Sequence, residues 1–140
     1  MGQASPEVAV IPEGAGDDRR FHARIDLAHV WRHVMAAYVR DVQADAPDAF
    51  TVHDRGELLE PHDLVFHLHT RLPWQIDAAA RRAELLLPDW KLTLHAPWAE
   101  DVTQAEDSID HRLEPVWHLQ CKVGGRTAFD LTTAFTCTPL

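Results

Sequence analysis

The chain has few cysteines, no long apolar run and no excess of positive charge, and each shortage argues against a class of protein. Only Cys121 and Cys137 occur in 140 residues, so we expect reduced thiols in a cytoplasmic protein rather than a disulfide framework. No apolar run approaches the roughly 20 residues of a membrane-spanning helix. The formal net charge of −9 argues against nucleic acid and anionic membranes as partners, because both attract positive surfaces.

The remaining composition is that of an ordinary globular protein. Hydrophobic residues make up 46% of the chain and charged residues 25%, and 140 residues fit one domain. Glycine and proline recur in residues 1–19, which predicts a flexible leader followed by a single domain over residues 20–140. The ten histidines are the one unusual feature.

The stretch from Asp26 to Asp45 predicts one long amphipathic helix. Its apolar residues recur at spacings of three and four, which places them on one helical face. They are Leu27, Val30, Trp31, Val34, Met35, Tyr38, Val39 and Val42. Asp26 is a suitable N-cap, and Pro47 would end the helix because proline has no N–H to donate. A helix this long needs a broad surface to lie on.

The second half of the chain predicts strands. Leu64, Phe66 and Leu68 alternate with polar residues, which is the period of a strand with one covered face. Residues 113–121 and 129–137 also alternate, and the loop Val123–Gly125, with Gly125 in the left-handed conformation, would join them into a hairpin with His118 opposite Asp130. The order predicts an α+β domain, in which one long helix packs on an antiparallel sheet of four to six strands.

One segment resembles a known family. The run Arg24-Ile25-Asp26-Leu27-Ala28-His29, continued to Tyr38-Val39-Arg40, resembles the start of the small acyl-CoA thioesterases of the hotdog fold. In that family an acidic residue at the helix mouth assists the attack of water on a thioester. The resemblance implies a hotdog-like homodimer with Asp26 at the acidic position. The motif departs from the family at Ala28, which replaces a second aspartate, and the usual glycine before the histidine is absent.

The expected function is therefore binding or hydrolysis of an acyl thioester, carried by CoA or an acyl-carrier protein, without a cofactor or metal. A carboxylate at a helix N-terminus can orient water while backbone N–H groups polarise the carbonyl, although the simpler role of Asp26 is that of an N-cap alone. The candidate catalytic residues are Asp26, His29 and His33. The candidate substrate-binding residues are His67, His69, Arg71, His118 and Tyr38.

Two other hypotheses stay open. The polar face of the sheet is locally basic and rich in histidine, so the chain could be a non-enzymatic binding or assembly module that holds an anionic ligand or another subunit. Alternatively, a cystatin-like sheet could curl around a small apolar ligand. His29 with His33, and His67 with His69, have spacings that suit a shared metal ion, but the two pairs would lie on opposite sides of the sheet.

Overall fold

The chain is an all-β protein. The computed structural model describes residues 13–17, 20–107 and 115–140, and these form one antiparallel sheet of nine strands. The strands are β1 (Glu13–Gly16), β2 (Phe21–Asp26), β3 (Met35–Ala46), β4 (Ala49–Thr70), β5 (Gln75–Asp77), β6 (Arg82–Leu86), β7 (Trp90–His95), β8 (Asp101–Asp107) and β9 (Val116–Pro139). Neighbours follow the order β1-β2-β3-β4-β9-β7-β6-β5, and β8 pairs with β9. None of these residues belongs to a helix long and apolar enough to cross a membrane.

Two compact units share the long strands β4 and β9. Unit 1 consists of the described residues up to His62 together with Gly125–Ala134. Unit 2 consists of Asp63–Gly124 and Phe135–Leu140. Each unit has its own buried side chains, and each is described separately below.

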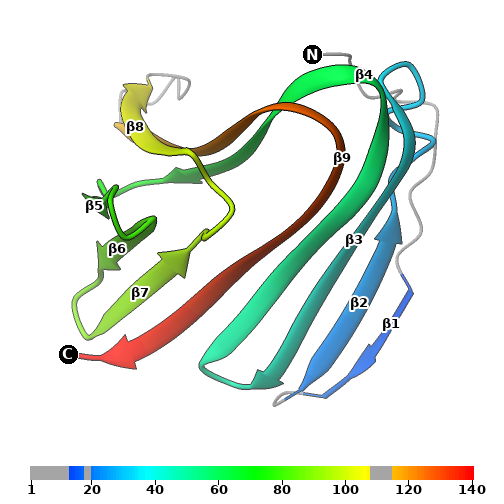
Figure 1. Ribbon diagram of the computed structural model, residues 1–140. Helices are drawn as coiled ribbons and strands as arrows, with labels where there is room; N and C mark the ends of the chain where they lie inside the picture. Colours follow the sequence, from blue (N-terminus) through cyan, green and yellow to red (C-terminus); the bar gives the residue numbers. More distant parts are fainter. Residues whose placement is uncertain (1–12, 18–19, 108–114) are drawn as a thin grey trace. The chain divides into compact units, whose positions relative to one another are not determined.

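In unit 1 the strands β1, β2, β3 and the first part of β4 lie side by side (Figure 1). Directly opposed residues share a face, and successive residues alternate between faces. The apolar face carries Val42 opposite Val52, and the ring of Tyr38 meets that of Phe129 edge-on at 5.6 Å. The other face is polar and is described with the functional site.

Unit 2 contains the hairpins β5–β6 and β6–β7, and β8 pairs with the first part of β9 (Figure 1). Leu94, Leu119 and Cys121 are fully buried there, and burial raises the pKa of the Cys121 thiol to about 11. The side chain of Gln104 bonds to both backbone groups of Trp74, at 2.9 Å to its N–H and 2.6 Å to its carbonyl oxygen.

The predicted helix over Asp26–Asp45 is wrong. The strand β2 ends at Asp26, residues 28–34 form turns, and β3 begins at Met35. Asp26 does cap a turn, because its carboxylate accepts a bond of 3.0 Å from the N–H of Ala28. The strand β3 was hidden because ionised residues occur on both of its faces, Arg40 on one and Asp41 on the other. Its apolar residues therefore lack a clear period of two.

Because that helix is absent from the described residues, the α+β class and the hotdog fold are both wrong. A hotdog sheet wraps a long helix, and the described residues form nine strands and no helix. The acyl-CoA thioesterase family is therefore not the family of this chain. A cystatin-like fold also needs a helix, and the same strands leave none among the residues described.

The predicted hairpin around Val123–Gly125 is also wrong, because β9 runs through it as one strand. Gly125 does take the left-handed conformation expected of it, with φ of 64°. The chain continues in the same strand after that irregularity instead of turning back. His118 and Asp130 consequently have different partners, His67 and His53.

The alternation in β4 is confirmed. Leu64 is buried, whereas His67 and His69 are exposed. Of the expected leader, residues 1–12 and 18–19 lie outside the described residues. Glu13–Gly16 forms β1 and pairs with β2. An added Cβ at Gly14 would lie 2.8 Å from the carbonyl oxygen of His22, so this pairing depends on glycine.

Candidate functional site

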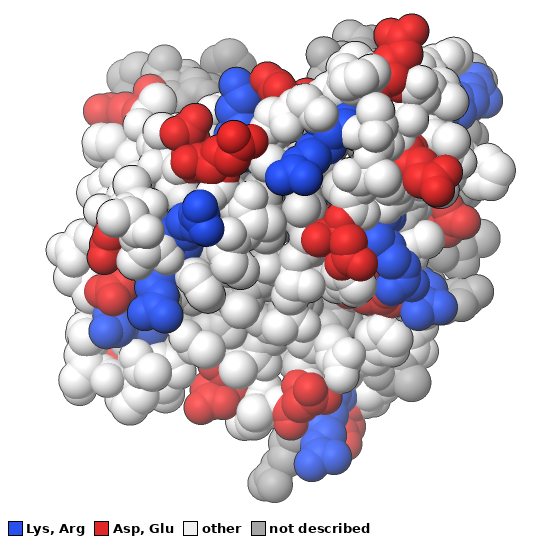
Figure 2. All heavy atoms as spheres, in the orientation of Figure 1, with Lys and Arg blue, Asp and Glu red and all other residues white. Residues whose placement is uncertain are grey.

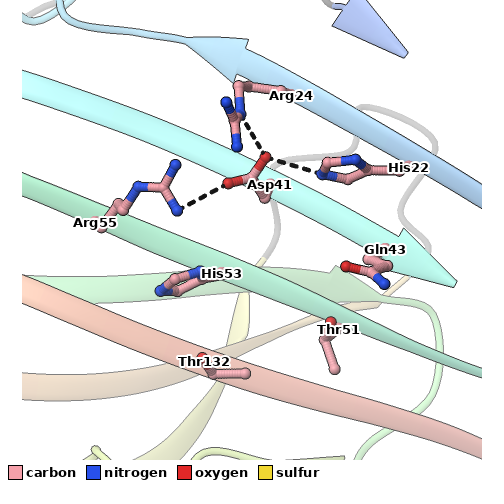
Figure 3. A pocket seen from close by; sticks show the side chains of 8 residues that line it. All are labelled: His22, Arg24, Asp41, Gln43, Thr51, His53, Arg55 and Thr132. Carbon is pink, nitrogen blue, oxygen red and sulfur yellow. Dashed lines mark hydrogen bonds and ion pairs between the residues drawn. The ribbon is translucent and has the colours of Figure 1, made fainter. Parts of the chain in front are cut away.

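A polar pocket of about 320 Å³ lies on the unit 1 sheet. Figure 3 shows its lining residues, which come from β2, β3, β4 and β9. They are His22, Arg24, Asp41, Gln43, Thr51, His53, Arg55 and Thr132. None of these residues was among the candidates named from the sequence.

The strand register places these side chains together. Asp41 lies opposite Arg24 on β2 and opposite His53 on β4. Since residues two apart point to the same side, His22 and Arg55 join the same face. The signal was present in the sequence as polar residues two apart in three successive segments, His22-x-Arg24, Asp41-x-Gln43 and Thr51-x-His53-x-Arg55. It becomes visible only when the three segments are read as neighbouring strands.

Asp41 is the buried centre of the pocket, with 7% of its surface exposed. One carboxylate oxygen accepts bonds from Arg24 Nε at 2.9 Å and His22 Nε2 at 3.0 Å, and the other lies 3.2 Å from an Arg55 guanidinium nitrogen. Burial by itself raises the pKa of this carboxyl. The bonds from Arg24 and His22 and the charges of the two arginines outweigh burial and hold the pKa below its ordinary value.

His53 has a carboxylate partner at the rim of the pocket. Its Nε2 lies 2.5 Å from Asp130 Oδ1, and the Asp130 side chain is 74% exposed. With the histidines neutral, the two lining arginines exceed the single lining aspartate by one positive charge. The Asp130 carboxylate at the rim brings this balance to zero, so the site does not share the negative excess of a chain whose formal net charge is −9.

The pocket is not built as a metal site. The contacts of Asp41 are already two arginines and a histidine. Within the described ranges, no group of three or more His, Cys, Asp or Glu residues is arranged to hold a metal ion. Among the described residues on the face drawn in Figure 2, acidic and basic side chains are interspersed and neither sign forms an extended patch.

Tyr38, a candidate substrate-binding residue, lies on the opposite face from the pocket. Its hydroxyl donates to Asp54 at 2.8 Å, and Arg40 bonds to both oxygens of Asp54 at 2.7 and 3.1 Å. Burial and the Asp54 charge raise the pKa of Tyr38 above its ordinary value, so its hydroxyl stays protonated. This cluster fixes two strands to one another and does not face the pocket.

The candidate catalytic residues are not brought to the pocket. Asp26 ends β2 and is exposed, and His29 and His33 lie on exposed turns between β2 and β3. In unit 2, by contrast, three of the predicted substrate-binding residues do meet: His67, His69 and His118 form one cluster. Arg71 lies directly after the end of β4 and is exposed.

Comparisons with known proteins bear on the fold. No family model and no curated protein matches the chain. Among solved structures, heparan sulfate lyase HepC from Pedobacter heparinus matches with a TM-score of 0.75 at 10% identity, over 94% of this chain and 22% of the lyase. A heparinase III matches with a TM-score of 0.69 at 9% identity, over 94% of this chain and 21% of that enzyme. The chain thus spans about a fifth of the length of these lyases, and at such identities the likeness shows that it shares the fold of one of their β-regions.

Proposed function

We propose that this domain binds an acidic carbohydrate, with the polar pocket of unit 1 holding the anionic group. The observation that carries the proposal is that Arg24 and Arg55 share the single buried carboxylate of Asp41 in one pocket. Their side chains are 50% and 40% exposed, so both cations are fixed in place and still reachable from solvent. Arginine suits a carboxylate or sulfate because its planar N–H donors match two oxygens at once.

The other lining residues fit a sugar. Thr51, Thr132 and Gln43 offer hydroxyl and amide groups, which exchange hydrogen bonds with sugar hydroxyls. A volume of about 320 Å³ lies at the lower end of small-ligand pockets and suits one sugar ring. The pocket is open and polar, so we expect it to hold one residue of a chain rather than to enclose a free apolar molecule.

The structural neighbours support the same class of ligand. They are described as enzymes acting on heparan sulfate, an anionic polysaccharide. Because this chain corresponds to about a fifth of their length, the proposal is limited to binding and does not extend to cleavage. The non-enzymatic binding module predicted from the sequence used a different surface, the histidine-rich face with His67, His69 and His118, so the proposal shares its class but not its site.

Thioester binding at a helix N-terminus stays an untested prediction, and the helix that it required is not found in the described part of the chain. The expected homo-oligomer and cytoplasmic location also stay predictions. They are checked by solution mass and by cell fractionation.

Calorimetric titration tests the proposal directly. A heparan sulfate oligosaccharide is titrated into the protein at low and at high salt, and an uncharged oligosaccharide of similar length is the ligand control. We expect saturable binding of the acidic ligand only, weakened by salt because the attraction is electrostatic. Arg24→Gln and Arg55→Gln should each weaken binding about tenfold or more, since each removes a charged hydrogen bond of about 1.5–3 kcal/mol.

Arg126→Gln is the matched control, because Arg126 is an exposed arginine of unit 1 that does not line the pocket. Its affinity should equal that of the unaltered protein. Circular dichroism and melting curves establish that each variant is folded. Equal losses in all three variants would show non-specific attraction, and no binding of any acidic oligosaccharide at low salt would overturn the proposal.

A further inference from the structure

Three imidazole rings form a stack on the polar face of unit 2, here called the histidine stack. His67 and His69 lie on β4, and His118 lies on β9. The His118 ring stacks on His69 with centroids 4.2 Å apart and an interplanar angle of 18°, and on His67 at 4.8 Å and 28°. His67 Nδ1 and His118 Nε2 are 2.6 Å apart, which is a direct hydrogen bond between the two strands.

That hydrogen bond forms only when one of the two facing nitrogens carries a proton and the other does not. Neutral imidazole has one N–H donor and one acceptor nitrogen, whereas protonated imidazole has two donors and no acceptor. The bond between His67 and His118 therefore survives with one proton between the two facing nitrogens and is lost when both carry one. A stack of imidazolium rings would also bring like charges within 5 Å.

Acidic and basic residues of the described strands share this face with the histidine stack. On the same face, Asp63 and Lys122 lie 3.3 Å apart and pair with each other. Arg71 comes directly after the end of β4 at Thr70. From β8, the residues directly opposite His118 and Gln120 are Ala105 and Thr103. The two aspartates of β8 on this face are Asp101, opposite Lys122, and Asp107, opposite Val116. Gln120 contacts His118 Nδ1 at 3.4 Å and is uncharged.

The electrostatic consequence appears at His67. Partial burial first, and then the neighbouring His118 and His69 rings, lower the pKa of His67 below its ordinary value of 6.5. A histidine whose pKa is lowered in the folded state resists a proton that the unfolded chain accepts. Its contribution to stability is therefore complete above pH 6.5 and is lost as the pH falls below that value.

We propose that the histidine stack is a proton-sensitive latch, which holds β4 against β9 in unit 2 at neutral pH and releases the pairing on mild acidification. Release means loss of the bond between His67 and His118 and faster opening of the adjoining strand segments. The latch is separate from the polar pocket of unit 1, so it stands whether or not that pocket binds a carbohydrate.

Amide hydrogen exchange by NMR tests the latch. Protection of residues 64–70 and 116–122 is measured from pH 7.5 to 5.5, after correction for intrinsic exchange. We expect protection to fall in these segments as the pH drops below 6.5, because the opened segments accept a proton that the folded stack resists. In His118→Gln, which removes the shared ring, protection should fall by less over the same range, because burial and His69 still act on His67.

Ring titrations in the same samples provide an independent readout. In His118→Gln the midpoint of His67 should rise toward 6.5. His62→Gln is the control for loss of an exposed histidine on β4. If His118→Gln does not fold, His67→Gln replaces it in the hydrogen-exchange measurement. Identical pH dependence of protection in the unaltered protein and the folded variant would overturn the latch.

Discussion

The basic side chains on the polar face of unit 1 and those on the polar face of unit 2 have different partners. In unit 1, Arg24 and Arg55 meet the buried carboxylate of Asp41. In unit 2, His67, His69 and His118 contact one another. The first arrangement is charged at any pH above the range where carboxylates titrate, whereas the second is stable only while its rings are largely neutral.

This difference separates two uses of one kind of surface. A permanent charge held by a buried counter-charge is suited to binding an anion, because its geometry does not depend on pH near neutrality. A cluster of bases that bond to and stack on one another is suited to responding to pH. The strand β4 contributes residues two apart to both sites. His53 and Arg55 line the pocket of unit 1, and His67 and His69 belong to the histidine stack of unit 2.

The largest expected effect comes from removing a buried counter-charge in unit 1. Asp54→Ala leaves Arg40 and the Tyr38 hydroxyl without their shared acceptor on the less exposed face. Breaking a buried ion pair costs about 3–5 kcal/mol, and we expect the lower end because the Arg40 side chain is 34% exposed. Urea denaturation measures the loss. Asp48→Ala, at an exposed turn position, should change stability by less than about 0.5 kcal/mol.

Asp41→Asn should cost less, about 2 kcal/mol near neutral pH, because its partners are half-exposed and regain water. The effect should depend on pH. The pKa of Asp41 is lowered in the folded protein, so its contribution is complete above the ordinary value of 3.8 and is lost as the pH falls through the lowered value. Denaturation curves should therefore differ between the two proteins at pH 7 and converge toward pH 3. A difference that stays constant with pH would show that packing, not charge, sets the cost.

The sequence predicted strands correctly where one face is apolar and the other is not. Leu64 and His67 illustrate this in β4, which is covered on one face and exposed on the other. It failed in β3, because Arg40 and Asp41 each find a partner on a neighbouring strand and both faces carry charge. Apolar residues that remain between such positions match a helical period by coincidence.

Sequence patterns did not predict which distant strands pair with one another. Gly125 was correctly expected to be left-handed, but a left-handed glycine fits an irregular strand as well as a turn. The partner of His118 lies 51 residues earlier, and that of Asp130 lies 77 residues earlier. The histidine stack could therefore be anticipated as residues of one surface, although not as rings in contact. The polar pocket was missed because its strands were interpreted as a helix.

The smallest expected effect comes from an exposed ion pair in unit 2, and it tests whether burial of the counter-charge sets the cost of losing an ion pair. Lys122 and Asp63 lie 3.3 Å apart, but their side chains are 48% and 55% exposed. Water solvates both charges in the unfolded and folded chain alike, so Lys122→Ala should cost less than about 1 kcal/mol, and less still in high salt. Denaturation curves at low and high salt measure this, with Asp41→Asn as the contrasting unit 1 variant. If the two substitutions cost the same, burial of the counter-charge would not be what distinguishes the polar face of unit 1 from that of unit 2.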